Sequence, residues 1–177
     1  MNVKMLKVNE NHALKRWEAI SHPDVSKWVF IDLPVSFEKT LDWCKSITDR
    51  PDRMDFCFEV DGAVAGFAGI VNIDQKSKVA ELYIFLHPSF FSKGLGTVFL
   101  HHLIAFGKLE LNLRKISLWV TLDNTKAVTF YEKNNFQVEG VLKQHVWFRG
   151  SYRDRALMSI FTEDFQVDSV KFYTEVL

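Results

Sequence analysis

The fold is decided by the stretch from Val79 to Leu111, VAELYIFLHPSFFSKGLGTVFLHHLIAFGKLEL. The residues up to Leu86 form the strongest strand signal of the chain, and His87-Pro88 closes it. From Thr97 onward, apolar residues recur at the spacing of a helix. The stretch therefore predicts a strand that leads through a glycine-containing turn into a helix.

The chain after this helix returns to strands. Lys115 to Val120 (KISLWV) reads as a strand, and the order of strand, helix and strand predicts a parallel crossover. A further helix is expected from Asn124 to about Lys133, ending at Asn134-Asn135, residue types that tolerate a left-handed helix cap. Two late strands complete the pattern: Gln137 to Phe148 and Tyr152 to Phe161.

The chain before Val79 predicts two helices and a hairpin. Apolar residues at helical spacing indicate a helix from Asn9 to Ile20 and a second amphipathic helix from Ser36 to Ile47. Asp55 to Val60 alternates, Asp61-Gly62 is a strong two-residue turn signal, and Ala63 to Ile73 resumes a strand. Both helices are thus expected to precede any strand.

The composition is that of an ordinary globular protein. The chain has 177 residues, 47% of them apolar and 25% charged, with a formal net charge of zero. This balance excludes a global attraction to nucleic acid, and no apolar run has the length of a signal region or membrane span. We expect one cytoplasmic domain over residues 1–177, with no nucleic-acid or membrane partner and with 163–177 as a terminal helix or a tail.

The two cysteines, Cys44 and Cys57, show no CxxC or Cys/His spacing. We expect buried free thiols rather than a disulfide or a metal site, and no metal is predicted.

The turn from Ser92 to Thr97 (SKGLGT) carries the sharpest chemical signal. A turn that opens a helix presents unpaired backbone N–H groups at the positive end of the helix dipole, where an anion is favoured. Gly94 and Gly96 let the backbone approach a pyrophosphate without a Cβ in the way. Lys93 adds positive charge, and the hydroxyls of Ser92 and Thr97 can donate hydrogen bonds. A plain helix-start turn would show the same glycine pattern.

A second signal lies in the helix after Asn124. Asparagine is a favoured N-cap residue, and Tyr131 follows seven positions later, about two turns along the same face. A tyrosine hydroxyl is protonated near neutral pH, so it is suited to protonating a departing thiolate. The alternative is a tyrosine that only packs.

In this order and spacing, the two signals resemble the GCN5-related N-acetyltransferase (GNAT) family. The resemblance covers roughly Met5 to Phe161 and is most specific from Glu81 to Phe136. It implies an α/β (α+β) fold, with a central mixed, mostly antiparallel sheet that contains a splayed parallel strand pair and is flanked by helices. It also implies an N-acetyltransferase that uses acetyl-CoA as co-substrate and needs no metal.

The resemblance assigns roles to particular residues. The turn binds the coenzyme A pyrophosphate, although Phe91 stands where the family usually has Gln or Arg, so one side-chain contact is lost. Tyr131 protonates the leaving thiolate, and main-chain groups near Phe85 and Leu86 hold the pantetheine arm. The expected cofactor-binding residues are Phe85, Leu86, Ser92, Lys93, Gly94, Leu95, Gly96, Thr97, Asn124 and Tyr131.

An attacking amine must first lose a proton, and Glu81 is the candidate group. Alternation places it on one strand face with Tyr83 and Phe85. Its carboxylate can act as the base, bind a cationic substrate or form a structural ion pair, and the sequence leaves these open. His87 and His145 are weaker candidates for the base and are expected to be structural.

The acceptor amine is the least determined point. The segment from Glu139 to Asp154 looks like the branch of spermidine and ribosomal-protein alanine acetyltransferases, whereas His22 to Trp28 looks like enzymes that acetylate nucleotide-linked amino sugars. An opening rich in aromatic residues favours stacking on a sugar or base, so the amino sugar is placed ahead of the polyamine. Trp28, Glu81 and Tyr83 are the expected substrate-binding residues, a homodimer is expected, and a cofactor-binding module without catalysis is the other class of protein to exclude.

Overall fold

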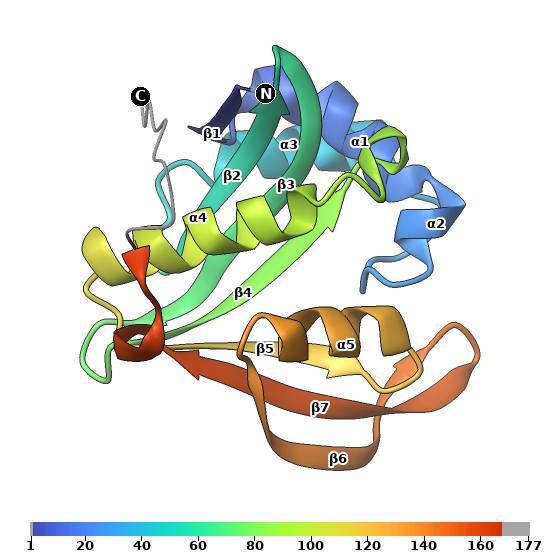
Figure 1. Cartoon of the computed structure of the whole chain (residues 1–177). Helices are drawn as coiled ribbons and strands as arrows, with labels where there is room; N and C mark the ends of the chain where they lie inside the picture. Colours follow the sequence, from blue (N-terminus) through green and yellow to red (C-terminus); the bar gives the residue numbers. More distant parts are fainter. Residues whose placement is uncertain (1, 168–177) are drawn as a thin grey trace.

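A computed structural model describes residues 2–167 and shows one seven-stranded sheet in the order β1-β2-β3-β4-β5-β7-β6 (Figure 1). The strands are β1 (Val3–Lys7), β2 (Arg53–Val60), β3 (Ala63–Asp74), β4 (Val79–Leu86), β5 (Lys115–Thr121), β6 (Gln137–Phe148) and β7 (Ser151–Phe161). The helices are α1 (Ala13–Ser21), α2 (Pro23–Ser26), α3 (Phe37–Ser46), α4 (Leu95–Leu109) and α5 (Thr125–Lys133). Three short 3-10 turns are Glu10–His12, Pro88–Phe90 and Thr162–Asp164.

The pairing of β4 with β5 is the feature that creates the site. These strands are parallel and pair over only three positions, Val79 with Lys115, Ala80 with Ile116 and Glu81 with Ser117. Beyond Glu81 they diverge, as Figure 1 shows for the two arrows. All other neighbouring strands pair in antiparallel fashion. The mixed, mostly antiparallel sheet with a splayed parallel pair is therefore confirmed.

Alternating residues of the strands pack into two hydrophobic cores, one on each face of the sheet. Phe58 on β2 stacks on Phe99 of α4, with ring centroids 4.1 Å apart, inside the larger core. Its neighbour Cys57 points the other way, into the core under α1 and α3 with Phe67 and Phe85. Helix α4 thus covers one face of the sheet, and α1 and α3 cover the other.

The local turn chemistry follows the sequence closely. Asp61 and Gly62 both have positive φ values, 50° and 83°, as a two-residue hairpin turn requires. Ser36 caps α3, and Asn135 after α5 is left-handed with φ 66°. Cys44 and Cys57 are free and buried, as expected.

Three sequence predictions need correction or comment. The helices do not precede every strand, because β1 comes first and pairs along β2; its five residues include three lysine and methionine positions that carry little strand signal on their own. Helix α4 begins at Leu95 rather than Thr97, because its N-cap is Gly94, which has a left-handed backbone conformation. Of the segment 163–177, the structure places the 3-10 turn and the buried Phe165, and positions 168–177 lie outside the described residues.

Within residues 2–167, no helix has both the length and the apolar character that a membrane crossing requires.

Candidate active site

Two clefts open where β4 and β5 diverge. The inner cleft, of about 490 Å³, is walled by Glu81–Leu86 of β4, Trp119–Thr121 of β5 and the segment 24–30, and Arg16 and Arg155 reach into it. The outer cleft, of about 630 Å³, is walled by the turn Phe90–Thr97 and by the start of α5. Both clefts share a boundary, formed by Asp24, Trp28, Ile84, Leu86, Phe91, Asn124, Ala127 and Tyr131.

The glycine turn forms one wall of the outer cleft. Gly94 caps α4 with φ 73° and offers no side-chain bond, so the N–H groups of the first turn remain available as donors. A Cβ at Gly94 would meet nothing within 4 Å, so the positive φ is what requires glycine there. The six predicted residues from Ser92 to Thr97 all line this cleft. Its donors suit the diphosphate of coenzyme A.

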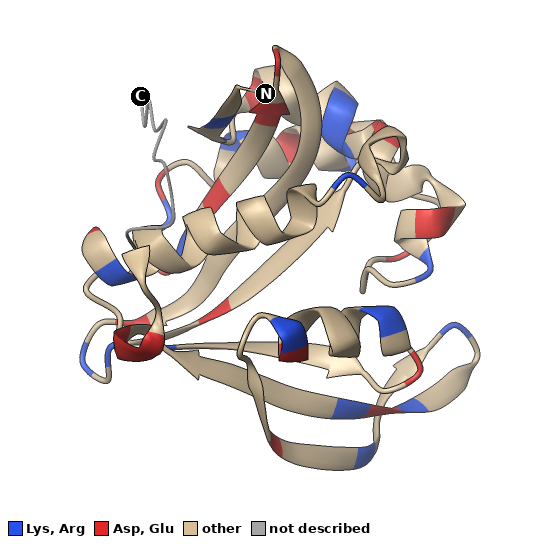
Figure 2. Cartoon of the chain, viewed as in Figure 1, with Lys and Arg blue, Asp and Glu red and all other residues tan. Residues whose placement is uncertain are grey.

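Lysines add positive charge around the same opening. Lys27, Lys93 and Lys126 line the outer cleft, from the end of α2, the glycine turn and α5. In Figure 2, each of these three segments carries a blue Lys or Arg position, and red Asp or Glu positions lie among them. Phe91, which replaces the usual Gln or Arg, is 40% exposed and lies at the shared boundary. Lys27 is paired with Asp24 at 2.8 Å, so the N-terminus of α4, Lys93 and Lys126 are the groups that can attract an anion to this opening.

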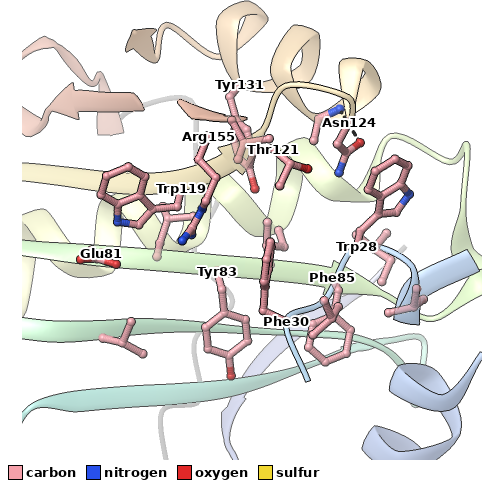
Figure 3. Close-up of a pocket in the computed structure, with 18 of the residues that line it drawn as sticks. Trp28, Phe30, Glu81, Tyr83, Phe85, Trp119, Thr121, Asn124, Tyr131 and Arg155 are labelled. Carbon is pink, nitrogen blue, oxygen red and sulfur yellow. Dashed lines mark hydrogen bonds between the residues drawn. The ribbon is translucent and has the colours of Figure 1, made fainter. Parts of the chain in front are cut away.

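Tyr131 stands between the two clefts. It projects from α5 toward the space above β4, with only 8% of its surface exposed (Figure 3). Burial raises the pKa of its hydroxyl above the ordinary value, with no charge or hydrogen bond contributing. Asn124 fixes the start of the same helix, because its side-chain oxygen accepts a hydrogen bond of 3.3 Å from the Ala127 N–H. Tyr131 is thus a protonated group at the junction.

The substrate-binding residues predicted from the sequence all reach the inner cleft. Trp28, Glu81 and Tyr83 line it, together with Phe85, which was predicted to contact the cofactor but borders only the inner cleft. Glu81 lies at the last paired position of β4, where the splay begins. In Figure 3 it lies beside Trp119, at the far end of the cleft from Trp28.

The hydroxyl of Tyr83 points away from the inner cleft. Asp55, Gly69 and Tyr83 occupy one row across β2, β3 and β4. The Tyr83 hydroxyl donates a 2.5 Å hydrogen bond to Asp55 Oδ1, and burial raises its pKa. A Cβ at Gly69 would lie 2.4 Å from the Tyr83 ring, so glycine makes this crossing possible. Tyr83 therefore offers the cleft a ring surface, while its polar end is used by the protein.

Two arginines of the inner cleft were missed by sequence reasoning. Arg16 comes from α1, and its guanidinium lies 3.8 Å from the Trp43 ring centroid. Arg155 comes from β7 and lies between Trp119 and Phe30, 4.9 Å and 5.0 Å from their centroids. A usable signal existed for Arg155, since a charged residue in a late strand among Ala, Leu and Met needs an explanation.

The two histidines considered as bases lie outside both clefts. His87 accepts a hydrogen bond from the Ser89 N–H at the end of β4, and His145 packs on Trp119, with centroids 5.3 Å apart. These contacts agree with the structural roles expected for them. Among residues 2–167, no group of three His, Cys, Asp or Glu side chains is placed to hold a metal ion.

A splayed parallel pair, flanked by a glycine turn and a tyrosine-bearing helix, is the arrangement of the acetyltransferase class that the sequence resembled. The comparison with protein families agrees, because residues 13–136 match the model of the acetyltransferase (GNAT) family. The chain therefore belongs to this family.

Several of the similar proteins are spermidine acetyltransferases. Spermidine N(1)-acetyltransferase of Escherichia coli K12 is 36% identical over 68% of this chain and 64% of that protein, so the match spans less than two thirds of the relative. The Vibrio cholerae counterpart is 29% identical over 66% of this chain and 67% of that protein. A crystal structure of Vibrio cholerae spermidine N-acetyltransferase with CoA and spermine shares the fold, with a TM-score of 0.86 at 22% identity, over 91% of this chain and 96% of that chain.

Proposed function

We propose that this protein transfers the acetyl group of acetyl-CoA to a primary amine of a small molecule. The observation that carries the proposal is the junction at Tyr131, where a cleft with anion-binding donors meets a second cleft that contains a carboxylate. The donor thioester would lie at this junction, and the acceptor amine would enter from the inner cleft. Family membership supports the same chemistry.

The proposed chemistry follows from the chain's own groups. The first turn of α4 holds the diphosphate, and the edge of β4 that faces β5 beyond Glu81 has no paired strand there, so its main-chain groups can contact the pantetheine arm and the developing oxyanion. Tyr131 gives its proton to the sulfur as the carbon–sulfur bond breaks, and burial keeps that proton in place until then. An amine nitrogen, once deprotonated, forms the new bond to carbon.

Glu81 is better placed to bind a second positive charge of the acceptor than to take the proton of the reacting amine directly. It lies four residues before Phe85, or roughly 13 Å along the strand at about 3.3 Å per residue. A proton leaving an amine at the thioester would therefore need water to reach this carboxylate. Glu81→Gln should accordingly raise the KM for the amine more than it lowers kcat, and steady-state kinetics with both substrates measures this. A fall in kcat with an unchanged KM would instead make Glu81 the base.

The names of the relatives favour a polyamine over the nucleotide-linked amino sugar that the sequence analysis placed first. Spermidine is therefore the reference acceptor for any assay. A protein N-terminus is the remaining alternative, and it would need an open groove for a peptide at the inner cleft.

The test combines binding and turnover. We expect calorimetry to show acetyl-CoA binding, and thiol release to require a small amine, with spermidine, amino sugars and peptides as the panel. Turnover of peptides alone would replace the proposal by the protein N-terminal reaction, and binding without turnover of any amine would leave only a cofactor-binding module.

The homodimer stays a prediction. A dodecameric Vibrio cholerae spermidine N-acetyltransferase has the same fold, with a TM-score of 0.80 at 22% identity. Light scattering after size exclusion would decide the state of this chain.

A further inference from the structure

The inner cleft contains two guanidinium groups whose hydrogen-bonding capacity the protein does not use. Nη1 of Arg16 and Nε of Arg155 are buried, and neither has a hydrogen-bond partner among the described residues. Both side chains line the inner cleft. Because a buried N–H without a partner costs free energy, such groups in a ligand cleft point to an acceptor atom that arrives with the ligand.

Aromatic stacking accounts for the faces of these groups but leaves their edges. Arg16 lies over Trp43, and Arg155 lies between Trp119 and Phe30. Stacking satisfies the flat face of a guanidinium, whereas its N–H groups point outward in the plane of the group. The rings therefore hold each guanidinium group in place, and its N–H donors remain available to a ligand.

The carboxylates of the same cleft do not neutralise this charge. Among the described residues, the charged groups that line the inner cleft are Arg16, Asp24, Glu81 and Arg155. Asp24 is already paired with Lys27 at 2.8 Å. Glu81 is the carboxylate of this cleft whose negative charge acts on the Arg155 guanidinium. A ligand with several positive charges and no negative one would meet two guanidinium groups against a single uncommitted carboxylate.

We infer that the preferred acceptor carries an anionic group, a carboxylate or a phosphate, in the same molecule as its amine. This rests on the proposed acetyl transfer to a small-molecule amine, and it replaces the polyamine that the relatives favour by an acceptor that carries a negative charge. Arg16 and Arg155 bind the anion, for which the planar set of N–H donors of a guanidinium is well matched. The acceptor of this chain would then differ from spermidine, whose charges are all positive.

The test uses pairs of acceptors that differ only in the anion. One pair is 4-aminobutyrate and its amide, another is glucosamine 6-phosphate and glucosamine, and spermidine is the cationic reference. With saturating acetyl-CoA, kcat/KM should be about 10- to 100-fold higher for the anionic member of at least one pair, the range expected of hydrogen bonds to a charged group. The pair that shows the larger ratio tells carboxylate from phosphate.

Variants link the preference to the cleft. Arg155→Gln should bring the ratio of kcat/KM between the anionic and the neutral member of a pair close to one, while leaving the KM for acetyl-CoA unchanged. Arg155→Lys should retain part of this preference. Arg50→Gln is the matched control, since Arg50 is exposed and pairs with Asp52 outside both clefts. Arg16→Lys, which keeps a positive charge beside Trp43 but removes the planar guanidinium, should also lower the ratio.

The outcomes separate this inference from the proposed function. Turnover of spermidine in preference to all four compounds, or equal kcat/KM within both pairs, overturns the anionic acceptor and leaves the acetyltransferase standing. A ratio that survives Arg155→Gln also overturns it. No turnover of any amine overturns both.

Discussion

Removing the Tyr131 hydroxyl is the sharpest test of the proposed chemistry. Tyr131→Phe deletes one oxygen from a side chain that is 8% exposed and keeps the ring that packs against Phe136, with centroids 5.6 Å apart. Because burial is the sole cause of the raised pKa, no charged or hydrogen-bonding partner loses an interaction. We therefore expect the free energy of unfolding to change by less than about 1 kcal/mol, the net value of one hydrogen bond, because none is lost.

The effect on turnover should be far larger. Proton transfer by a positioned group contributes about 100- to 10,000-fold, which corresponds to about 2.7 to 5.4 kcal/mol of barrier at about 1.36 kcal/mol per factor of ten. The assay is thiol release at saturating acetyl-CoA and amine, with calorimetry for acetyl-CoA affinity, which should stay within about threefold.

The pH profile adds a second readout. A folded-state pKa above the ordinary tyrosine value keeps Tyr131 protonated up to and beyond about pH 10, so the wild-type rate should not fall until above that pH. The same sign means that Tyr131 favours the folded state below the unfolded-chain pKa and loses this contribution as the pH rises above it. Tyr152→Phe is the control, because Tyr152 is 62% exposed and lies outside both clefts. Turnover in Tyr131→Phe equal to that control would refute the proton-donor role.

Two further predictions concern groups that shape the clefts. Gly94→Ala should cost about 1 kcal/mol of stability, because φ 73° is unfavourable for a residue with a Cβ, and should raise the KM for acetyl-CoA several-fold. Gly62→Ala, at φ 83° in the β2–β3 turn outside both clefts, should cost similar stability with no change in that KM. Asp55→Ala should lower the unfolding free energy by about 3 kcal/mol in urea denaturation, because it leaves the Arg53 guanidinium without its 2.6 Å and 2.8 Å bonds. An unchanged midpoint would show that this buried pair is not stabilising.

The parts of the fold that the sequence predicted are those specified by short-range signals. The strand before Leu86, the glycine turn and helix α4 are contiguous, and alternation, a positive φ and helical spacing are all local properties. Strand β1 could not be found in this way, because Val3–Lys7 becomes a strand through its pairing with β2, more than forty residues later. The splay itself followed from the family resemblance.

The candidate site divides along the same line. Ser92 to Thr97 and Tyr131 were predictable, since a turn and one helix place them. The direction of the Tyr83 hydroxyl was not predictable. Alternation gives the strand face of Tyr83, but its hydroxyl donates a hydrogen bond to Asp55, 28 residues away in the sequence. Arg16 and Arg155 belong to α1 and β7, at nearly opposite ends of the chain, and only the assembled sheet brings them to one cleft.

The tip of the β6–β7 hairpin ties down the segment that walls the inner cleft. Arg149 donates hydrogen bonds of 3.0 Å and 3.2 Å to the carbonyl oxygens of Ser26 and Ile31, which lie 123 and 118 residues earlier. The Phe148 ring packs against Phe30, with centroids 4.3 Å apart. During synthesis the glycine turn and its helix leave the ribosome well before this hairpin does. The segment 24–30, which lines both clefts, can thus reach its final position only after this hairpin has been made, late in synthesis.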